Sequence, residues 1–169
     1  MNVQPTISEA INLLELSPQV FFLLAGDLSE KQAAAKPDAT SWSVTEIVAH
    51  LIHTERHCYQ SRLEHIICAR TAVVPAYDAT RFEAEGAYSG ATLRTALSEV
   101  SELRAESIRQ LRCLNENDFA RCATHESVGR FTLAELVYEW VAHDVGHIRQ
   151  VAIVIRDVLY NPFIGPFHD

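Results

Sequence analysis

The sequence is poor in basic residues. Its 169 residues include 14 Lys and Arg against 22 Asp and Glu, which gives a formal net charge of −8 at pH 7. Proteins that bind the phosphate backbone of nucleic acids need a basic surface, so this balance argues against a nucleic-acid partner. Apolar residues make up 48% and charged residues 21% of the chain, which is typical of a globular protein rather than a disordered one.

Long apolar runs and paired cysteines are also missing. The longest apolar runs, such as Val20–Ala25 and Val151–Ile155, are far shorter than the roughly 20 residues that span a bilayer. The N-terminus lacks the basic and apolar regions of a signal peptide. The four cysteines form no C-x-x-C pair, which favours reduced thiols. We therefore expect a cytoplasmic protein with no membrane partner.

Apolar residues recur at helical intervals in four long stretches, and no stretch alternates with the two-residue period of a strand. The four stretches cover residues 6–28, 43–69, 91–114 and 132–158. The first is interrupted at Ser17-Pro18, where we expect a kink or a split. Residues 1–169 are most simply one domain with its own core. The sequence predicts an all-α fold, a four-helix bundle.

Two capping boxes mark the starts of the second and fourth helices. These are Ser43-Val44-Thr45-Glu46 and Thr132-Leu133-Ala134-Glu135, each with Glu three residues after the N-cap. Between the second and third helices, Arg70–Gly90 has weak periodicity and is predicted to be a long ordered loop, a kind of loop that is often functional and lies over a site. Asn115–Arg130 is polar, and the tail Asn161–Phe167 is expected to pack over the bundle.

Histidines provide the candidate metal ligands. His143 and His147 lie four residues apart, hence on one face of the fourth helix and beside its apolar side. Such a pair can hold one divalent metal, although packed structural histidines explain the same spacing. The second helix carries the stripe His50, His53 and His57, which lies away from the apolar centre of that helix. For His53 and His57 this position favours ordinary solvated side chains.

Two acidic residues lie on apolar helix faces. Glu55 is in the middle of the apolar side of the second helix, so it is paired with an Arg or lies near a metal site, with general base as a weaker third role. Asp144 is on the apolar side of the fourth helix. It either orients an imidazole or pairs with Arg56 or Arg149, and an ordinary interhelical salt bridge is an equal alternative.

Two segments resemble the signatures of a known family. The segment Trp42–Leu51, followed by Glu55, resembles the W-S-x-x-E-x-x-x-H-L-x-x-x-E pattern of the DinB/YfiT-like superfamily. The segment Gly129–Leu136, leading to His143–Gln150, is similar to the second signature of that family. The resemblance extends over nearly the whole chain, because the order of helices, capped helices and long loop is the same.

The resemblance implies an up-down-down-up four-helix bundle and a divalent metal, zinc or nickel, held by His50, His143 and His147. The helical angle alone places His50 toward the polar side of its helix, so its inclusion depends on the family pattern. Three imidazoles and a water form a catalytic type of site, because one coordination position remains open.

The same resemblance implies a metal-dependent enzyme that acts on a small molecule and activates water or a thiol. Its reaction would be that of a hydrolase or of an S-transferase with a low-molecular-weight thiol as cosubstrate. The alternative is a non-catalytic helical bundle that binds a ligand or a partner and has a structural or vestigial metal site. Val151–Val158 is apolar nearly all round, which favours burial by other helices or by the second subunit of a homodimer, as in the family.

Overall fold

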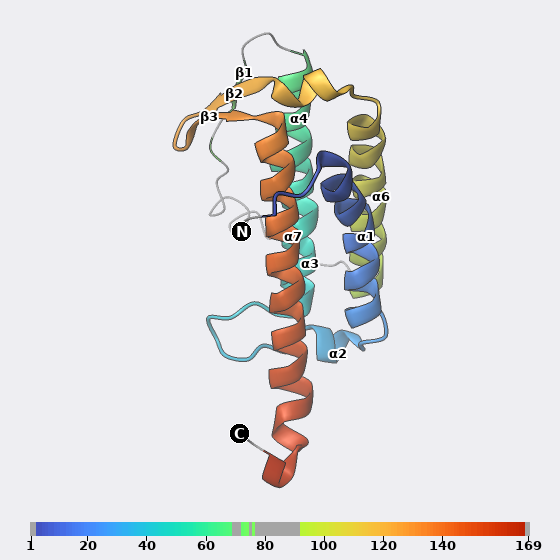
Figure 1. Cartoon of the computed structure of the whole chain (residues 1–169). Helices are drawn as coiled ribbons and strands as arrows, with labels where there is room; N and C mark the ends of the chain where they lie inside the picture. The colour runs from blue at the N-terminus through green and yellow to red at the C-terminus, as the bar shows by residue number, and fades with distance from the viewer. Residues whose placement is uncertain (1–2, 69–71, 75, 77–91, 168–169) are drawn as a thin grey trace.

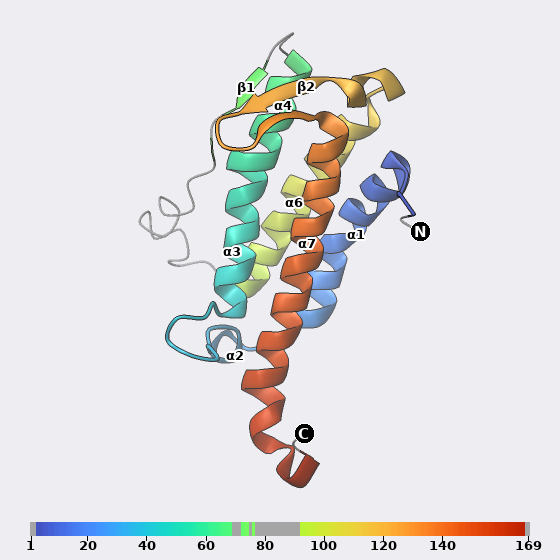
Figure 2. The ribbon, with the colours of Figure 1, turned by 60° about the vertical axis from the view of Figure 1, so that its left-hand side comes forward.

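The computed structural model describes residues 3–68, 72–74, 76 and 92–167. Four long helical segments form a bundle (Figures 1 and 2). They are α1 (Ile7–Ala25), α3 (Val44–Thr54) with its continuation, α6 (Leu93–Arg112) and α7 (Leu133–Ile155). A π-helical turn, η1 (Glu55–Gln60), continues α3 into α4 (Ser61–Cys68). In Figure 1, α1 and α7 run in one direction while α3 and α6 run in the other. The predicted all-α four-helix bundle is confirmed.

Both predicted capping boxes are present. The backbone N–H of Glu46 donates to Ser43 Oγ at 3.2 Å, and Glu46 Oε2 accepts from the backbone N–H of Ser43 at 2.8 Å. Thr132 and Glu135 exchange the same pair of bonds at 3.2 and 2.7 Å. These bonds satisfy amides that the first turn of a helix leaves free. They fix the residues at which α3 and α7 begin. The start of each helix in turn sets how far along the bundle its histidines lie.

Helix α1 is continuous through Pro18, so the expected split at this position is wrong. Proline removes the amide that would bond to the carbonyl four residues earlier, here that of Leu14. That carbonyl accepts instead from Arg104 Nη1 at 2.9 Å. Because this side chain replaces the missing donor, the helix tolerates the proline inside the bundle.

Three short strands lie at one end of the bundle, near α4 and the start of α7 (Figure 1). They are β1 (Ala72–Val74), β2 (Cys122–His125) and β3 (Gly129–Thr132). β1 and β2 are parallel, whereas β2 and β3 form an antiparallel hairpin. The sequence predicted no strands, and this prediction is wrong. Segments of three or four residues are too short to show the two-residue period by which strands are recognised. Apart from 72–74 and 76, the predicted loop Arg70–Gly90 lies outside the described residues.

The C-terminal end of α7 extends beyond the other helices (Figures 1 and 2). It continues into the π-helical turn η3 (Arg156–Tyr160) and two 3₁₀ turns, η4 (Asn161–Phe163) and η5 (Gly165–Phe167). Phe163 and Phe167 are 83% and 82% exposed. The tail was expected to pack over the bundle, and this prediction is wrong, because α7 continues past the ends of its partner helices and carries the tail away from them.

One helix of the described residues, α1, is long and apolar enough to cross a membrane by length and composition alone. Core helices of globular proteins meet the same criterion. In α1 33% of the apolar window is buried: Leu14 and Phe21 lie inside the bundle, whereas Leu16 and Leu23 are 49% and 84% exposed. The smaller helix α2 (Glu30–Ala33), capped by Ser29, follows α1.

A layer of polar side chains divides the core into two apolar clusters. The cluster nearer the strands includes Leu14, Leu63, Leu111 and Trp140. The other cluster includes Phe21, Ile47, Leu97 and Val151. Each long helical segment contributes a buried polar residue between its residues of the two clusters: Ser17, Glu55, Arg104 and Asp144. We call these four residues, with Ser107, the polar layer.

Candidate metal centre and its supporting layer

Arg104 is the centre of the polar layer. Its guanidinium donates to Glu55, from Nη2 to Oε2 at 2.9 Å and from Nε to Oε1 at 3.1 Å. It also donates to Asp144, from Nη1 to Oδ2 at 2.6 Å and from Nη2 to Oδ1 at 3.2 Å. All three residues are at most 3% exposed. One cation on α6 thus joins carboxylates from η1 and α7 with the forked geometry that favours arginine over lysine.

The remaining acceptor positions of the two carboxylates are also occupied. Ser107 Oγ donates to Glu55 Oε1 at 2.7 Å, and Trp140 Nε1 donates to Glu55 Oε2 at 3.2 Å. Ser17 Oγ donates to Asp144 Oδ2. Burial opposes ionisation of Asp144, but Arg104 and these hydrogen bonds outweigh it and lower the pKa of Asp144 to about 2. Asp144 is therefore ionised near neutral pH.

His50, His143 and His147 converge beside the polar layer. Their ligand nitrogens all lie within 4.8 Å of one another. The Nε2 atom of His143 is 3.3 Å from that of His50 and 3.2 Å from that of His147. His50 comes from α3, and the other two come from successive turns of α7, so the group joins two helices that lie far apart in the sequence. The structure thus brings together the three predicted metal ligands.

His50 is only 8% exposed, so its predicted place on the polar side of its helix is wrong. Every residue from Ile47 to Leu51 is buried, because α3 is covered on nearly all sides at this level. The ring of Trp42 contributes to this cover, since its centroid is 4.9 Å from that of His50 and 6.4 Å from that of His147. A helical wheel shows one helix alone and cannot reveal which neighbours cover it.

The protonation states of His50 and His147 suit residues that bind a cation. His147 Nδ1 and Gln150 Oε1 are 2.8 Å apart. Because an amide oxygen can only accept a hydrogen bond, the ring proton of His147 is on Nδ1, which leaves a lone pair free on Nε2. Burial, followed by the imidazoles of His147 and His143, lowers the pKa of His50 to about 3. Burial and His143 also lower the pKa of His147. Both rings are therefore neutral near pH 7.

Asp144 and Glu55 lie behind the histidines. The Oδ1 atom of Asp144 is 3.8 Å from His143 Nδ1, which is longer than a hydrogen bond. The predicted partners of Asp144, Arg56 and Arg149, are wrong, because its partner is Arg104 and Arg56 forms an ion pair with Glu99 instead. The prediction that an Arg accompanies Glu55 is confirmed.

A catalytic role for Glu55 or Asp144 stays a prediction. The contacts of both carboxylates with Arg104 favour a role in positioning the helices. His53 and His57 are not part of the three-histidine group, and their rings contact each other at 4.5 Å between centroids.

Sequence reasoning missed Arg104 as a site residue, although a signal for it exists. Val100, Arg104 and Ile108 follow one another at four-residue spacing, so the arginine lies on the inward stripe of α6. An arginine on a buried stripe requires carboxylate partners, and Glu55 and Asp144 were already placed on apolar faces. The three observations together identify the polar layer.

Comparison with known proteins agrees with the fold described above. The family model of the DinB superfamily matches residues 13–151. The solved structure described as "YfiT from Bacillus subtilis is a probable metal-dependent hydrolase with an unusual four-helix bundle topology" has the same fold, with a TM-score of 0.81. The likeness covers 92% of this chain and 89% of that one at 20% sequence identity. The comparison with curated proteins gives no match.

Proposed function

The chain belongs to the DinB superfamily, and we propose that it is a metal-dependent enzyme in which His50, His143 and His147 hold one divalent ion, zinc or nickel. The spacing of the three imidazole nitrogens carries this proposal. Two nitrogens at 2.0–2.1 Å from a tetrahedral zinc ion lie about 3.3 Å apart. The separations of His143 Nε2 from His50 Nε2 and from His147 Nε2, 3.3 and 3.2 Å, agree with this value, and the ligand nitrogens of all three residues lie within 4.8 Å of one another.

The charge of the polar layer supports a cation at this place. Glu55 and Asp144 bring two carboxylates against the single guanidinium of Arg104, which leaves one buried negative charge. That charge lies next to His143 in the interior, where water screens it weakly. Three neutral imidazoles add no charge of their own, so a divalent cation offsets the excess.

The residues of this chain hold and orient the site. Gln150 accepts the Nδ1 proton of His147 and thereby directs Nε2 toward His143. The polar layer fixes the relative heights of η1, α6 and α7, and with them the height of His143. A bound divalent ion with three protein ligands supplies an open position at which a water or thiol loses its proton near neutral pH.

We assign the enzyme to hydrolysis or to S-transfer with a low-molecular-weight thiol, acting on a small molecule. The neighbour from Bacillus subtilis is described as a probable metal-dependent hydrolase, which supports the first reaction. We further propose that the protein is cytoplasmic and homodimeric.

The decisive experiment measures metal content and turnover together. Protein purified without a His-tag is expected to contain close to one zinc or nickel ion per chain by elemental analysis, before or after reconstitution. Loaded protein is then compared with chelator-treated protein against a panel of esters, amides and thiol-dependent electrophiles. Well-folded protein that binds no metal after reconstitution would contradict the proposal and leave a helical binding module.

Gln150 provides a finer test of the same site. Replacing Gln150 by Leu removes the acceptor of the His147 Nδ1 proton, so zinc affinity is expected to fall by about 10–100-fold. Competition with a chromogenic chelator measures that affinity. Arg149→Leu is the matched control, because Arg149 is the exposed preceding residue on the same helix and its variant should bind zinc as the wild type does. Equal losses in both variants would mean that the Gln150 contact does not orient His147.

A further inference from the structure

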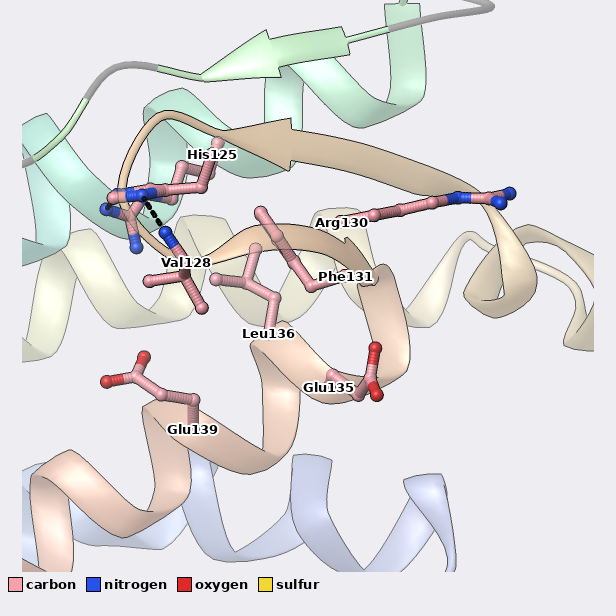
Figure 3. A pocket seen from close by; sticks show the side chains of 8 residues that line it. His125, Val128, Arg130, Phe131, Glu135, Leu136 and Glu139 are labelled. Carbon is pink, nitrogen blue, oxygen red and sulfur yellow. Dashed lines mark hydrogen bonds between the residues drawn. The ribbon is translucent and has the colours of Figure 1, made fainter.

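A second candidate binding site lies at the strand end of the bundle. A cavity of about 410 Å³ is lined by Arg62 of α4, by the β2–β3 hairpin and by the first turns of α7. Figure 3 shows His125 and Val128 at one side of it, with Phe131 and Leu136 forming the floor. Glu139 lies one helical turn before His143, and the buried ring of Tyr59 contacts His143 edge-on at 5.4 Å between centroids. His50, His143 and His147 are not among the described residues that line the cavity, so it is distinct from the three-histidine group.

His125 is surrounded by more donors than its ring can accept. The backbone N–H groups of Ser127 and Val128 point at its Nδ1 from 3.1 and 3.3 Å. The Nη2 atom of Arg62, which can only donate, lies 3.0 Å from its Nε2. In any protonation state at least one ring nitrogen carries a hydrogen, so both nitrogens cannot accept. One donor is left in excess at a side chain that is 8% exposed.

The excess donor lies between Arg62 and His125, which both line the cavity. With Nδ1 accepting from the hairpin, Nε2–H and the guanidinium of Arg62 form two adjacent donors at the cavity wall. Within the described part of the chain, Arg62 forms no ion pair, and its one hydrogen-bond contact is with His125. A half-buried arginine beside a second donor is the arrangement that binds a carboxylate with two oxygens.

The rest of the cavity sets the character of such a ligand. Val128, Phe131 and Leu136 offer an apolar surface next to the donors. The carboxylate of Glu139 lies on the α7 side (Figure 3), where it repels a second negative charge. Its charge adds to burial in raising the pKa of Tyr59. Arg130 also lines the cavity but extends away from His125 in Figure 3.

We propose that this cavity binds a small monocarboxylate with an apolar body, whose carboxylate accepts from Arg62 and His125. This assignment does not depend on a metal at the three-histidine group. Three six-carbon probes separate its parts: hexanoate has the charge and the chain, 1-hexanol has the chain alone, and adipate carries a second carboxylate. Titration calorimetry is expected to give hexanoate an affinity about tenfold or more above that of 1-hexanol, because hydrogen bonds to a charged group are worth this much. Adipate is expected to bind more weakly than hexanoate, because Glu139 repels its second carboxylate.

Variants locate the binding. Arg62→Met keeps an apolar stem but removes the donors, and it is expected to weaken hexanoate binding by about tenfold or more. Arg130→Met removes a cation from the same cavity and should change the affinity for hexanoate less than twofold. Glu139→Gln should reduce the ratio of the hexanoate affinity to the adipate affinity. Hexanoate should also shift the ¹⁵N signals of the His125 ring in wild-type protein, a result that requires no variant to fold.

A carboxylate also binds metals, so the titrations use metal-loaded and chelator-treated protein. Equal hexanoate affinity in both preparations is expected. Binding that requires the metal, binding that is unchanged in Arg62→Met, or 1-hexanol binding as tightly as hexanoate would each overturn the assignment.

Discussion

Replacing Arg104 by Met is expected to lower the free energy of unfolding by about 3–5 kcal/mol. Methionine fills much of the space of the arginine stem, so the packing loss is small. The substitution leaves Glu55 and Asp144 facing each other across the core without a cation, at 2% exposure each. Urea unfolding followed by circular dichroism measures the change.

The matched control is Arg56→Met. Arg56 forms an ion pair with Glu99, but the side chains of both residues are more than one-third exposed. Exposed pairs of this kind contribute about 0–1 kcal/mol, because water screens them. A loss of similar size in the two variants would mean that the polar layer contributes no more than a surface pair.

A triple variant separates the charge from the packing. Glu55→Leu, Arg104→Met and Asp144→Leu together remove every charge of the layer, and apolar replacements of buried ion networks are often neutral or stabilising. We expect the triple variant to recover most of the stability lost in Arg104→Met. If it is instead less stable than the single variant, the shape of these side chains rather than their charge holds the helices.

The polar layer also explains why the bundle has one register. Two apolar clusters alone would tolerate helices shifted by a turn, because leucines and valines exchange places at little cost. Arg104 meets two carboxylates from different helices and the carbonyl that Pro18 leaves without its usual donor. A shifted helix would leave at least one of these groups buried without a partner. The same register brings His50 to the height of His143.

Local signals allowed much of this fold to be predicted. The capping boxes at Ser43 and Thr132 consist of residues three apart, and such contacts form within one turn regardless of the rest of the chain. The helices follow from apolar periodicity in the same way. Pro18 misled the prediction because its effect depends on Arg104, a residue 86 positions away in the sequence. The tail was mispredicted because the sequence does not show that α7 ends beyond the other helices of the bundle.

The site was predictable in its residues but not in its surroundings. His143 and His147 share a helix face by spacing alone, whereas His50 was assigned only through the family pattern. Its burial depends on Trp42 and α7, which a wheel drawn for one helix omits. The partner of Asp144 was missed for a similar reason. Arg56 and Arg149 were chosen from the sequence pattern, whereas the arginine that lies next to Asp144 in the folded chain is Arg104.

His50 is accordingly the residue whose replacement tests the site most sharply. His50→Ala removes one of three proposed ligands and the only one from α3. Zinc affinity is expected to fall by more than about 100-fold, because even the loss of a residue that only orients a ligand costs 10–100-fold. Competition with a chromogenic chelator measures the affinity, and elemental analysis should show the variant losing its metal during purification.

The matched control for this experiment is His57→Ala. His57 lies two turns further along the same helical segment, is exposed, and is outside the three-histidine group. Its variant should retain zinc at the wild-type affinity. If His50→Ala keeps its metal while His143→Ala loses it, the ion is held by α7 alone. Two protein ligands on one helix would then bind the metal without α3, and the open site that the proposed enzyme needs would not be built between the helices.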